Sequence, residues 1–215
     1  MQQTPTFFQK VQSKLRAWQH EYINRPLKLG TPIDRQVWEQ QFQEGMWDYL
    51  GSEDERGRFE EIVRCYREFG NGGTVLDVAC GGGWLYGYLK EAGLIMPHQY
   101  LGVDLSQTAV DGAQKRFPEA RLAQMDFDKD TLGERFDIIV FNECIYFFNK
   151  PAAKVDWCRK HNLEADGKFI FSIYGEEKNQ YLWPEVAKGN VLLSEKTVTN
   201  NKGQQWTIKT LRPVA

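Results

Sequence analysis

Hydrophobic residues recur at three- and four-residue intervals over the first ~70 residues, which is the spacing of one face of an α-helix. Helices are predicted over 7–23, 34–50 and 53–69. Asp34 and Ser52 stand where they can cap the second and third of these helices. After the glycine-rich stretch 70–73 the period changes, and short runs rich in β-branched residues alternate with helical segments. This alternation predicts βαβ units and a largely parallel sheet.

The pattern changes once more near the end of the chain. Five strand-like runs are separated by helical segments, and they cover 74–80, 100–106, 121–127, 136–143 and 168–175. Residues 191–200 and 204–213 flank Asn201-Lys202-Gly203, which favours an antiparallel hairpin. We therefore predict an α/β fold with a seven-stranded, mostly parallel sheet that ends in this hairpin. We divide the chain into an N-terminal helical cap, 1–52, and an α/β domain, 53–215.

Composition narrows the classes of function. Hydrophobic residues make up 41% of the 215 residues, yet no apolar run approaches the ~20 residues of a membrane span. The N-terminus lacks a secretory pattern, which predicts a cytoplasmic protein with no membrane partner. A net charge of -2 lacks the basic excess of nucleic-acid binders, so we expect no nucleic-acid partner. The four cysteines are scattered without metal-ligand spacing, which predicts reduced structural thiols and no metal site.

A glycine-rich loop follows the first predicted strand, in the stretch Asp77-Val78-Ala79-Cys80-Gly81-Gly82-Gly83. In open α/β sheets, ligands bind beyond the carboxyl ends of the strands, where small residues let the backbone approach them. A dinucleotide-binding loop would need a third glycine where Trp84 stands. The spacing fits better to a D-x-G-x-G-x-G loop in which only the first glycine is replaced, by Ala79.

Carboxylates stand at the ends of the next two predicted strands. Asp104 stands near the end of the stretch QYLGVDLS, residues 99–106, about twenty residues beyond the loop. A carboxylate at this position can accept hydrogen bonds from ribose hydroxyls. Asp126 and Phe127 lie in the stretch QMDFD, residues 124–128, which forms the end of the third predicted strand. The stretch FDIIVFNECIYFF, residues 136–148, follows as the fourth strand and its loop. These four motifs, in this order, resemble those of class I S-adenosylmethionine-dependent methyltransferases. The resemblance covers roughly residues 70 to 175 and implies a Rossmann-like fold with S-adenosylmethionine as cofactor.

The resemblance also implies a set of site residues. The predicted cofactor-binding residues are Asp77, Ala79, Gly81, Gly83, Asp104, Leu105, Asp126, Phe127, Asn142 and Trp47. Glu143 follows the fourth strand and is the candidate catalytic residue, as a general base or as a counter-charge for an amine; the alternative is a solvated loop carboxylate. Tyr49, Tyr146 and Tyr174 are candidate substrate contacts, although aromatic residues at such positions also serve in packing. Trp47 has the same alternative.

The segments GMWDYL, SEDERGRFEEIV and NECIYFF resemble small-molecule methyltransferases of bacterial secondary metabolism, including nodulation-factor N-methyltransferases. This resemblance implies a small-molecule acceptor, with an amine nitrogen favoured over oxygen. The alternatives are an O-methyltransferase acting on a hydroxyl or carboxyl group, a protein or RNA methyltransferase, and a catalytically inactive partner subunit. The segment before the hairpin is short for the family, and a homodimer is one way to complete that wall of the acceptor pocket.

Overall fold

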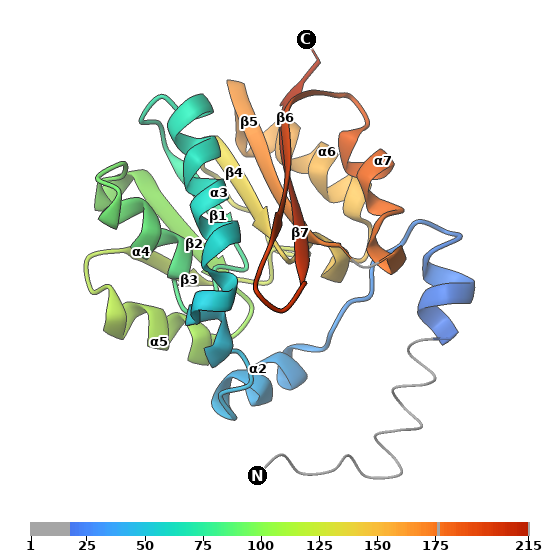
Figure 1. Ribbon diagram of the computed structural model, residues 1–215, viewed down its shortest axis with the longest axis horizontal. Coiled ribbons are helices and arrows are strands. Elements are labelled where there is room, and N and C mark those ends of the chain that lie inside the picture. Colours follow the sequence, from blue (N-terminus) through green and yellow to red (C-terminus); the bar gives the residue numbers. More distant parts are fainter. Residues whose placement is uncertain (1–17, 176, 215) are drawn as a thin grey trace.

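The computed structural model describes residues 18–175 and 177–214, and within them seven strands form one sheet with helices on both faces (Figure 1). The strand order is β3-β2-β1-β4-β5-β7-β6. The first five strands are parallel, and β7 runs antiparallel between β5 and β6. The strands are β1 (Val75–Val78), β2 (Tyr100–Asp104), β3 (Arg121–Gln124), β4 (Phe136–Asn142), β5 (Leu163–Tyr174), β6 (Asn190–Thr199) and β7 (Gln205–Pro213). The predicted α/β fold with its C-terminal hairpin is confirmed.

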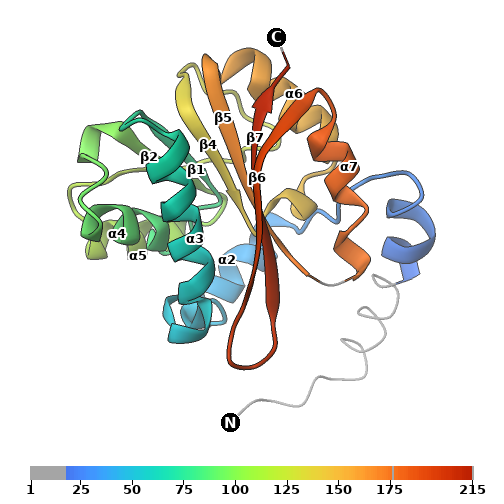
Figure 2. The same cartoon turned by 45° about the horizontal axis from the view of Figure 1, so that its top comes forward.

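The helices lie in two layers around this sheet. The α-helices are α2 (Arg35–Gln43), α3 (Glu53–Phe69), α4 (Trp84–Glu91), α5 (Gln107–Arg116), α6 (Pro151–His161) and α7 (Leu182–Ala187). Short 3₁₀ or π turns are η1 (His20–Asn24), η2 (Asp48–Gly51), η3 (Pro97–Gln99), η4 (Ile145–Phe147) and η5 (Glu177–Asn179). Figure 2 shows the hairpin of β6 and β7 extending past the sheet toward the side on which α2 lies.

Alternate residues of each central strand enter different cores. Val75 of β1 packs with side chains of α3 and α4, whereas its neighbour Leu76 packs with side chains of α6 and α7. Ile138 and Ile139 of β4 divide in the same way. This is the two-residue period of a strand that is covered on both faces, and it explains why successive residues of β1 and β4 are nearly all buried.

The second predicted helix is shorter than expected. It ends at Gln43 rather than continuing to residue 50, because Gly45 adopts a left-handed conformation with φ +69° and the chain turns. Asp34 caps α2 as predicted, since its side chain accepts a hydrogen bond from the amide of Gln36 at 2.8 Å. Ser52 occupies the predicted N-cap position of α3, but its side chain makes no capping bond within the described residues. Most of the first predicted helix lies outside the described residues.

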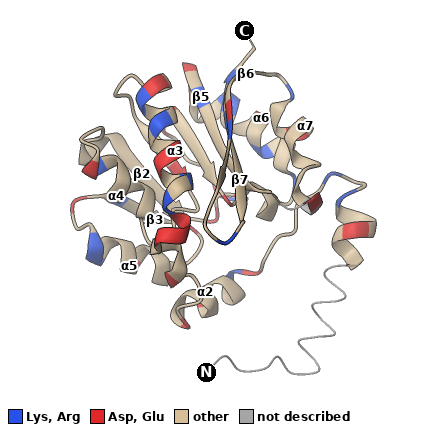
Figure 3. Ribbon diagram, viewed as in Figure 1, with Lys and Arg blue, Asp and Glu red and all other residues tan. Residues whose placement is uncertain are grey.

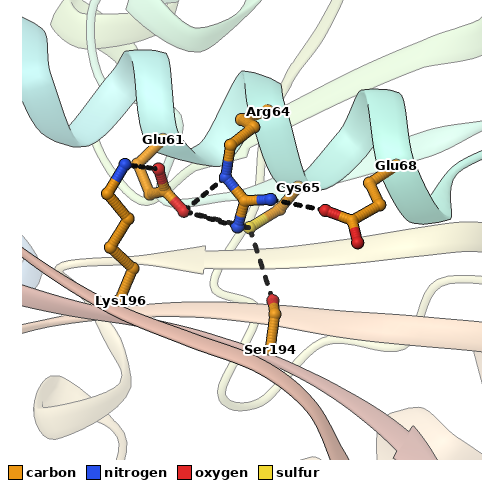
Figure 4. A network of polar contacts seen from close by, with 6 residues as sticks. All are labelled: Glu61, Arg64, Cys65, Glu68, Ser194 and Lys196. Carbon is orange, nitrogen blue, oxygen red and sulfur yellow. Dashed lines mark hydrogen bonds and ion pairs between the residues drawn. The ribbon is translucent and has the colours of Figure 1, made fainter.

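An ion pair within a larger polar network joins α3 to the edge strand β6 (Figure 4). The buried carboxylate of Glu61 contacts Lys196 of β6 at 2.8 Å and Arg64 at 2.7 Å. Cys65 lies 3.8 Å from the hydroxyl of Ser194. Since Glu61 is only 3% exposed, removal of either cation would leave a poorly solvated charge. The network therefore fixes the hairpin beside α3.

Charged residues of both signs alternate along the outer face of α3 (Figure 3). Arg56 and Glu60 are four residues apart and lie 2.7 Å from each other. Exposed pairs of this kind contribute only about 0.3–0.5 kcal/mol each, so they add little to the packing of the buried face. Within the described part of the chain, every helix is too short or too polar to cross a membrane.

Ala79 stands in the left-handed region, with φ +58°, where a Cβ is unfavourable. We expect Ala79→Gly to raise the free energy of unfolding by about 0.5–1 kcal/mol, since glycine relieves this strain. Ala92→Gly is the matched control, because Ala92 is also exposed but has φ -73°. There the same change should destabilise by about the same amount. Chemical denaturation of both variants measures the difference, and equal destabilisation would contradict the assignment of strain to Ala79.

Candidate functional site

A large cavity of about 1470 Å³ opens at the carboxyl ends of β1, β2 and β4. The glycine loop, the loop after β4 and residues from α2 to η2 all line it. Thirteen of the predicted site residues line it: Trp47, Tyr49, Asp77, Ala79, Gly81, Asp104, Leu105, Asp126, Phe127, Asn142, Glu143, Tyr146 and Tyr174. The fold therefore brings residues from five separate sequence motifs to one concave surface, the usual place for a ligand in such a sheet.

Gly83 is the exception among the predicted residues, since it does not line the cavity. It has φ +73° and precedes α4, and a Cβ built there would lie 3.2 Å from the Cβ of Ala113 in α5. The glycine is thus required for the turn and for close helix packing, and the predicted cofactor contact has no support in this geometry. Gly81 does face the cavity, with φ +52° and Phe42 as the nearest described contact of a built Cβ, at 3.8 Å.

Two buried carboxylates stand beside the glycine loop. Asp104 accepts hydrogen bonds from the amides of Gly81, at 2.8 Å, and Ser106, at 2.9 Å. Asp77 accepts one from the hydroxyl of Tyr100 at 2.6 Å, while its other oxygen has no partner among the described residues. Burial raises the pKa of Asp77 to about 7 and that of Asp104 to about 6. The pair makes this end of the cavity favourable for a hydrogen-bond donor or a cation.

The third acidic position lies at the end of β3. Asp126 is partly exposed and forms an ion pair with Lys129 at 2.7 Å. The neighbouring ring of Phe127 is buried, and the ammonium of Lys154 lies 4.9 Å from its centroid. One carboxylate oxygen of Asp126 is thus free of the ion pair with Lys129, and together with the ring of Phe127 it could contact a flat polar group of a ligand.

Glu143 is held in an unusual conformation just after β4. Its backbone has φ +58°, which is rare for a residue with a long side chain. The carboxylate accepts hydrogen bonds from the hydroxyl of Ser172 at 2.8 Å, the hydroxyl of Tyr146 at 3.0 Å and the amide of Tyr174 at 3.1 Å. Burial raises the pKa of Glu143 to about 7, although Arg58 acts in the opposite direction. A strained, hydrogen-bonded carboxylate in a cavity is a common arrangement at functional sites.

Sequence analysis did not identify Arg58, a buried member of the cavity wall. Arg58 is 2% exposed, forms an ion pair with Glu55 at 2.7 Å and donates a hydrogen bond to the side chain of Asn142. Glu55 and Arg58 lie on the same helix stripe as the core residues Phe59 and Ile62. Two charged residues on an apolar helix stripe were the sequence feature that could have indicated a buried ion pair, because charged groups are rarely buried without a partner.

Aromatic rings cover the cavity from the cap side. The ring centroids of Trp38 and Trp47 are 5.0 Å apart, and that of Tyr49 lies 6.1 Å from Trp47. Trp38 also meets Phe147 of the opposite loop edge-on at 5.0 Å. The indole nitrogen of Trp47 is buried without a hydrogen-bond partner in the described structure. The cap therefore supplies an apolar wall that also contains an unpaired donor.

Two predictions from composition concern the cysteines and metals. Cys65, Cys80, Cys144 and Cys158 are all buried free thiols, as predicted. Within residues 18–175 and 177–214, histidine, cysteine and acidic side chains form no group of three that could hold a metal ion.

Part of the chain is similar to known methyltransferases. A family model described as a methyltransferase domain matches residues 75–161. The ubiquinone biosynthesis O-methyltransferase of Idiomarina loihiensis (strain ATCC BAA-735 / DSM 15497 / L2-TR) is 32% identical over 128 residues, which are 56% of this chain and 50% of that protein. The chain spans half the length, or less, of the curated relatives it matches.

Solved structures show the same fold at low sequence identity. The N-methyltransferase NodS from Bradyrhizobium japonicum WM9, in complex with S-adenosyl-l-homocysteine, superposes with a TM-score of 0.68 at 16% identity, covering 82% of this chain and 98% of that one. The [4+2]-cyclase SpnF gives a TM-score of 0.66 at 14% identity, covering 86% and 98%. The methyltransferase-domain model thus matches residues 75–161, and the seven-stranded fold is similar to that of solved S-adenosylmethionine-dependent methyltransferases.

Proposed function

We propose that this chain transfers the methyl group of S-adenosylmethionine to a small-molecule acceptor, with an amine nitrogen favoured. The observation that carries the proposal is the unpaired oxygen of buried Asp77, which lies with Asp104 in a cavity beside an open glycine loop. An unpaired buried acceptor is costly unless a ligand supplies the missing donor. The ammonium of a methionyl group is such a donor.

The residues present fit the proposed cofactor. Asp104 retains lone pairs beyond its two backbone bonds, which suits ribose hydroxyls. Asp126 and Phe127 would take the adenine amine and ring, and Leu105 would line the same end. Gly81 and Ala79 leave room for the methionyl part, beside Asn142 and Trp47. We propose these contacts as the cofactor site.

When bound, the cofactor supplies a methyl group already activated on a sulfonium. The chain then has to align the acceptor and exclude water, and well-oriented reactants can reach effective molarities of about 10⁵–10⁸ M. The aromatic residues Trp47 and Tyr49 cover the cavity from the cap side. Aromatic faces attract cations by about 0.5–2 kcal/mol, so this wall also suits a sulfonium or an ammonium.

Glu143 is the proposed catalytic residue. Its carboxylate lies among Tyr146, Ser172 and Tyr174, where it can accept a proton from the acceptor or hold it as a counter-charge. We favour nitrogen because a carboxylate between tyrosines suits an ammonium group: it can take the proton of this group, and the freed nitrogen lone pair then attacks the methyl carbon. A hydroxyl acceptor is the alternative, and it would depend on Glu143 as a base. Tyr49, Tyr146 and Tyr174 are the proposed acceptor contacts.

A catalytically inactive partner subunit or another use of the fold is the second candidate, supported by Ala79 in the glycine loop and by the likeness to a cyclase. That likeness concerns the fold alone. Ala79 adopts the left-handed conformation that a glycine would take, so the loop keeps its path despite the replacement. We therefore favour catalysis.

Purified protein incubated with S-adenosylmethionine labelled with carbon-13 at the methyl group, together with a metabolite extract, tests the proposed function. We expect label to appear in a low-molecular-weight product, and the chemical shift of its methyl carbon separates N-methyl from O-methyl. Label on protein or RNA would instead indicate a macromolecular acceptor. Binding of the cofactor without any labelled product would favour the inactive partner.

A further inference from the structure

A carboxylate of the cap occupies the N-terminus of α5. Glu39 of α2 accepts hydrogen bonds from the hydroxyl of Ser106 at 2.8 Å and from the amide of Thr108 at 3.1 Å. The hydroxyl of Thr108 is a further donor to the same carboxylate, and it holds the pKa of Glu39 below its usual range. The first amides of a helix attract negative charge, so an ionised Glu39 is favoured there.

The same hydrogen bonds continue to the proposed ribose site. Ser106 is fully buried, and its amide donates to the carboxylate of Asp104 at 2.9 Å. The other oxygen of Asp104 accepts from the amide of Gly81 at 2.8 Å. Glu39, Ser106, Asp104 and Gly81 thus form one polar chain from the cap to the glycine loop. A change at Glu39 acts directly on the residues proposed to hold the cofactor.

Apart from the aromatic contacts of Trp38 and Phe42, α2 buries little of its surface. Among its described residues, none is buried, although several are partly buried. Trp38 and Phe42 of α2 line the cavity, and Phe42 lies 3.8 Å from the position of a Cβ on Gly81. The helix therefore covers the cofactor end of the cavity without a core of its own. Elements with little buried apolar surface open locally at low cost.

We propose that Glu39 is a latch which holds α2 closed over the cofactor end of the cavity and thereby sets the rate of cofactor exchange. This inference rests on the proposed function, because it takes S-adenosylmethionine and its demethylated product as the ligands. Glu39 is a positioning residue in this account, since it acts through Ser106 and Asp104. The latch must break whenever the cap opens to exchange the ligand.

Hydrogen exchange of the ligand-free protein tests the latch independently of any ligand. Glu39→Gln keeps the size of the side chain but removes its charge. We expect amides of residues 36–43 to exchange about tenfold faster in this variant, the effect of losing hydrogen bonds to a charged group. Glu44→Gln is the matched control, since Glu44 directly follows α2, is exposed, and its carboxylate accepts a hydrogen bond from the side chain of Gln40 at 2.7 Å. Equal exchange in Glu39→Gln and wild type would overturn the proposal.

Stopped-flow dissociation of S-adenosylhomocysteine tests the consequence for exchange. We expect Glu39→Gln to release this ligand about tenfold faster than wild type and Glu44→Gln to release it at the wild-type rate. A merely destabilising change would lower the fraction of protein that binds and leave the dissociation rate unchanged, which would overturn the role in exchange. If wild type bound no S-adenosylhomocysteine, the proposed function would fail, while the hydrogen-exchange comparison would still decide whether Glu39 holds α2.

Discussion

Glu143→Gln is expected to lower turnover about 10²- to 10⁴-fold, the usual contribution of a general base, while cofactor affinity stays nearly constant. The variant keeps the size of the side chain and one acceptor oxygen but loses charge and basicity. The carboxylate lies beside Tyr146 and Tyr174 after β4, and β2 and β1 separate this strand from β3, which the residues proposed for adenine follow. Steady-state kinetics with a labelled methyl group and calorimetry with S-adenosylhomocysteine measure the two quantities.

The pH profile separates a base from a mere counter-charge. Burial raises the pKa of Glu143 to about 7, so the wild-type carboxyl is protonated below that pH and cannot accept a proton. Wild-type turnover should therefore rise with pH through about 7, and this limb should be absent in Glu143→Gln. Ser172→Ala is the control, because it removes one hydrogen bond and leaves the carboxylate in place. An effect confined to KM would indicate binding of a cationic acceptor instead.

Gly81→Val should reduce cofactor affinity by more than about 100-fold, through two physical effects that add. A branched side chain is strained at φ +52°, and its methyl groups would enter the space between the glycine loop and Phe42. This space is where we propose the methionyl part to lie. Calorimetry with S-adenosylhomocysteine measures the change, and the melting temperature shows how much of the protein remains folded.

Gly72→Val separates backbone strain from blocked space. Gly72 also has a left-handed conformation, with φ +69°, but a Cβ there meets no described atom within 4 Å. It lies in the turn before β1, away from the cavity wall. We expect this variant to lose stability and to retain cofactor affinity. Normal binding by Gly81→Val would show that the loop glycines serve the turn alone.

Local sequence patterns predicted the strands and the C-terminal hairpin, but they did not predict the end of α2 or the presence of α7. β1, β2 and β4 were found because their short runs rich in β-branched residues alternate with helical segments. α2 was drawn too long because apolar residues continue at helical spacing beyond Gly45, whereas the left-handed glycine ends the helix. α7 was missed, since its six residues are too few to show a period.

The features of the site that the sequence did not predict depend on contacts between segments far apart in the chain. Eleven of the thirteen predicted residues share one cavity because they stand at or just after the ends of strands, and parallel strands end at one edge. Gly83 matches the spacing of the loop but does not line the cavity, because its geometry serves the packing of α4 against α5. Glu39 reaches Ser106 across 67 residues of sequence, a pairing that no local pattern indicates.

The most direct test of the account is a calorimetric titration of the purified wild-type chain and of Asp104→Ala with S-adenosylhomocysteine. The account predicts one molecule bound per wild-type chain, with affinity weakened about 10- to 150-fold in the folded variant, the effect of losing hydrogen bonds to a charged group worth about 1.5–3 kcal/mol. An absence of binding by the folded wild-type protein, or equal affinity in Asp104→Ala, would contradict it.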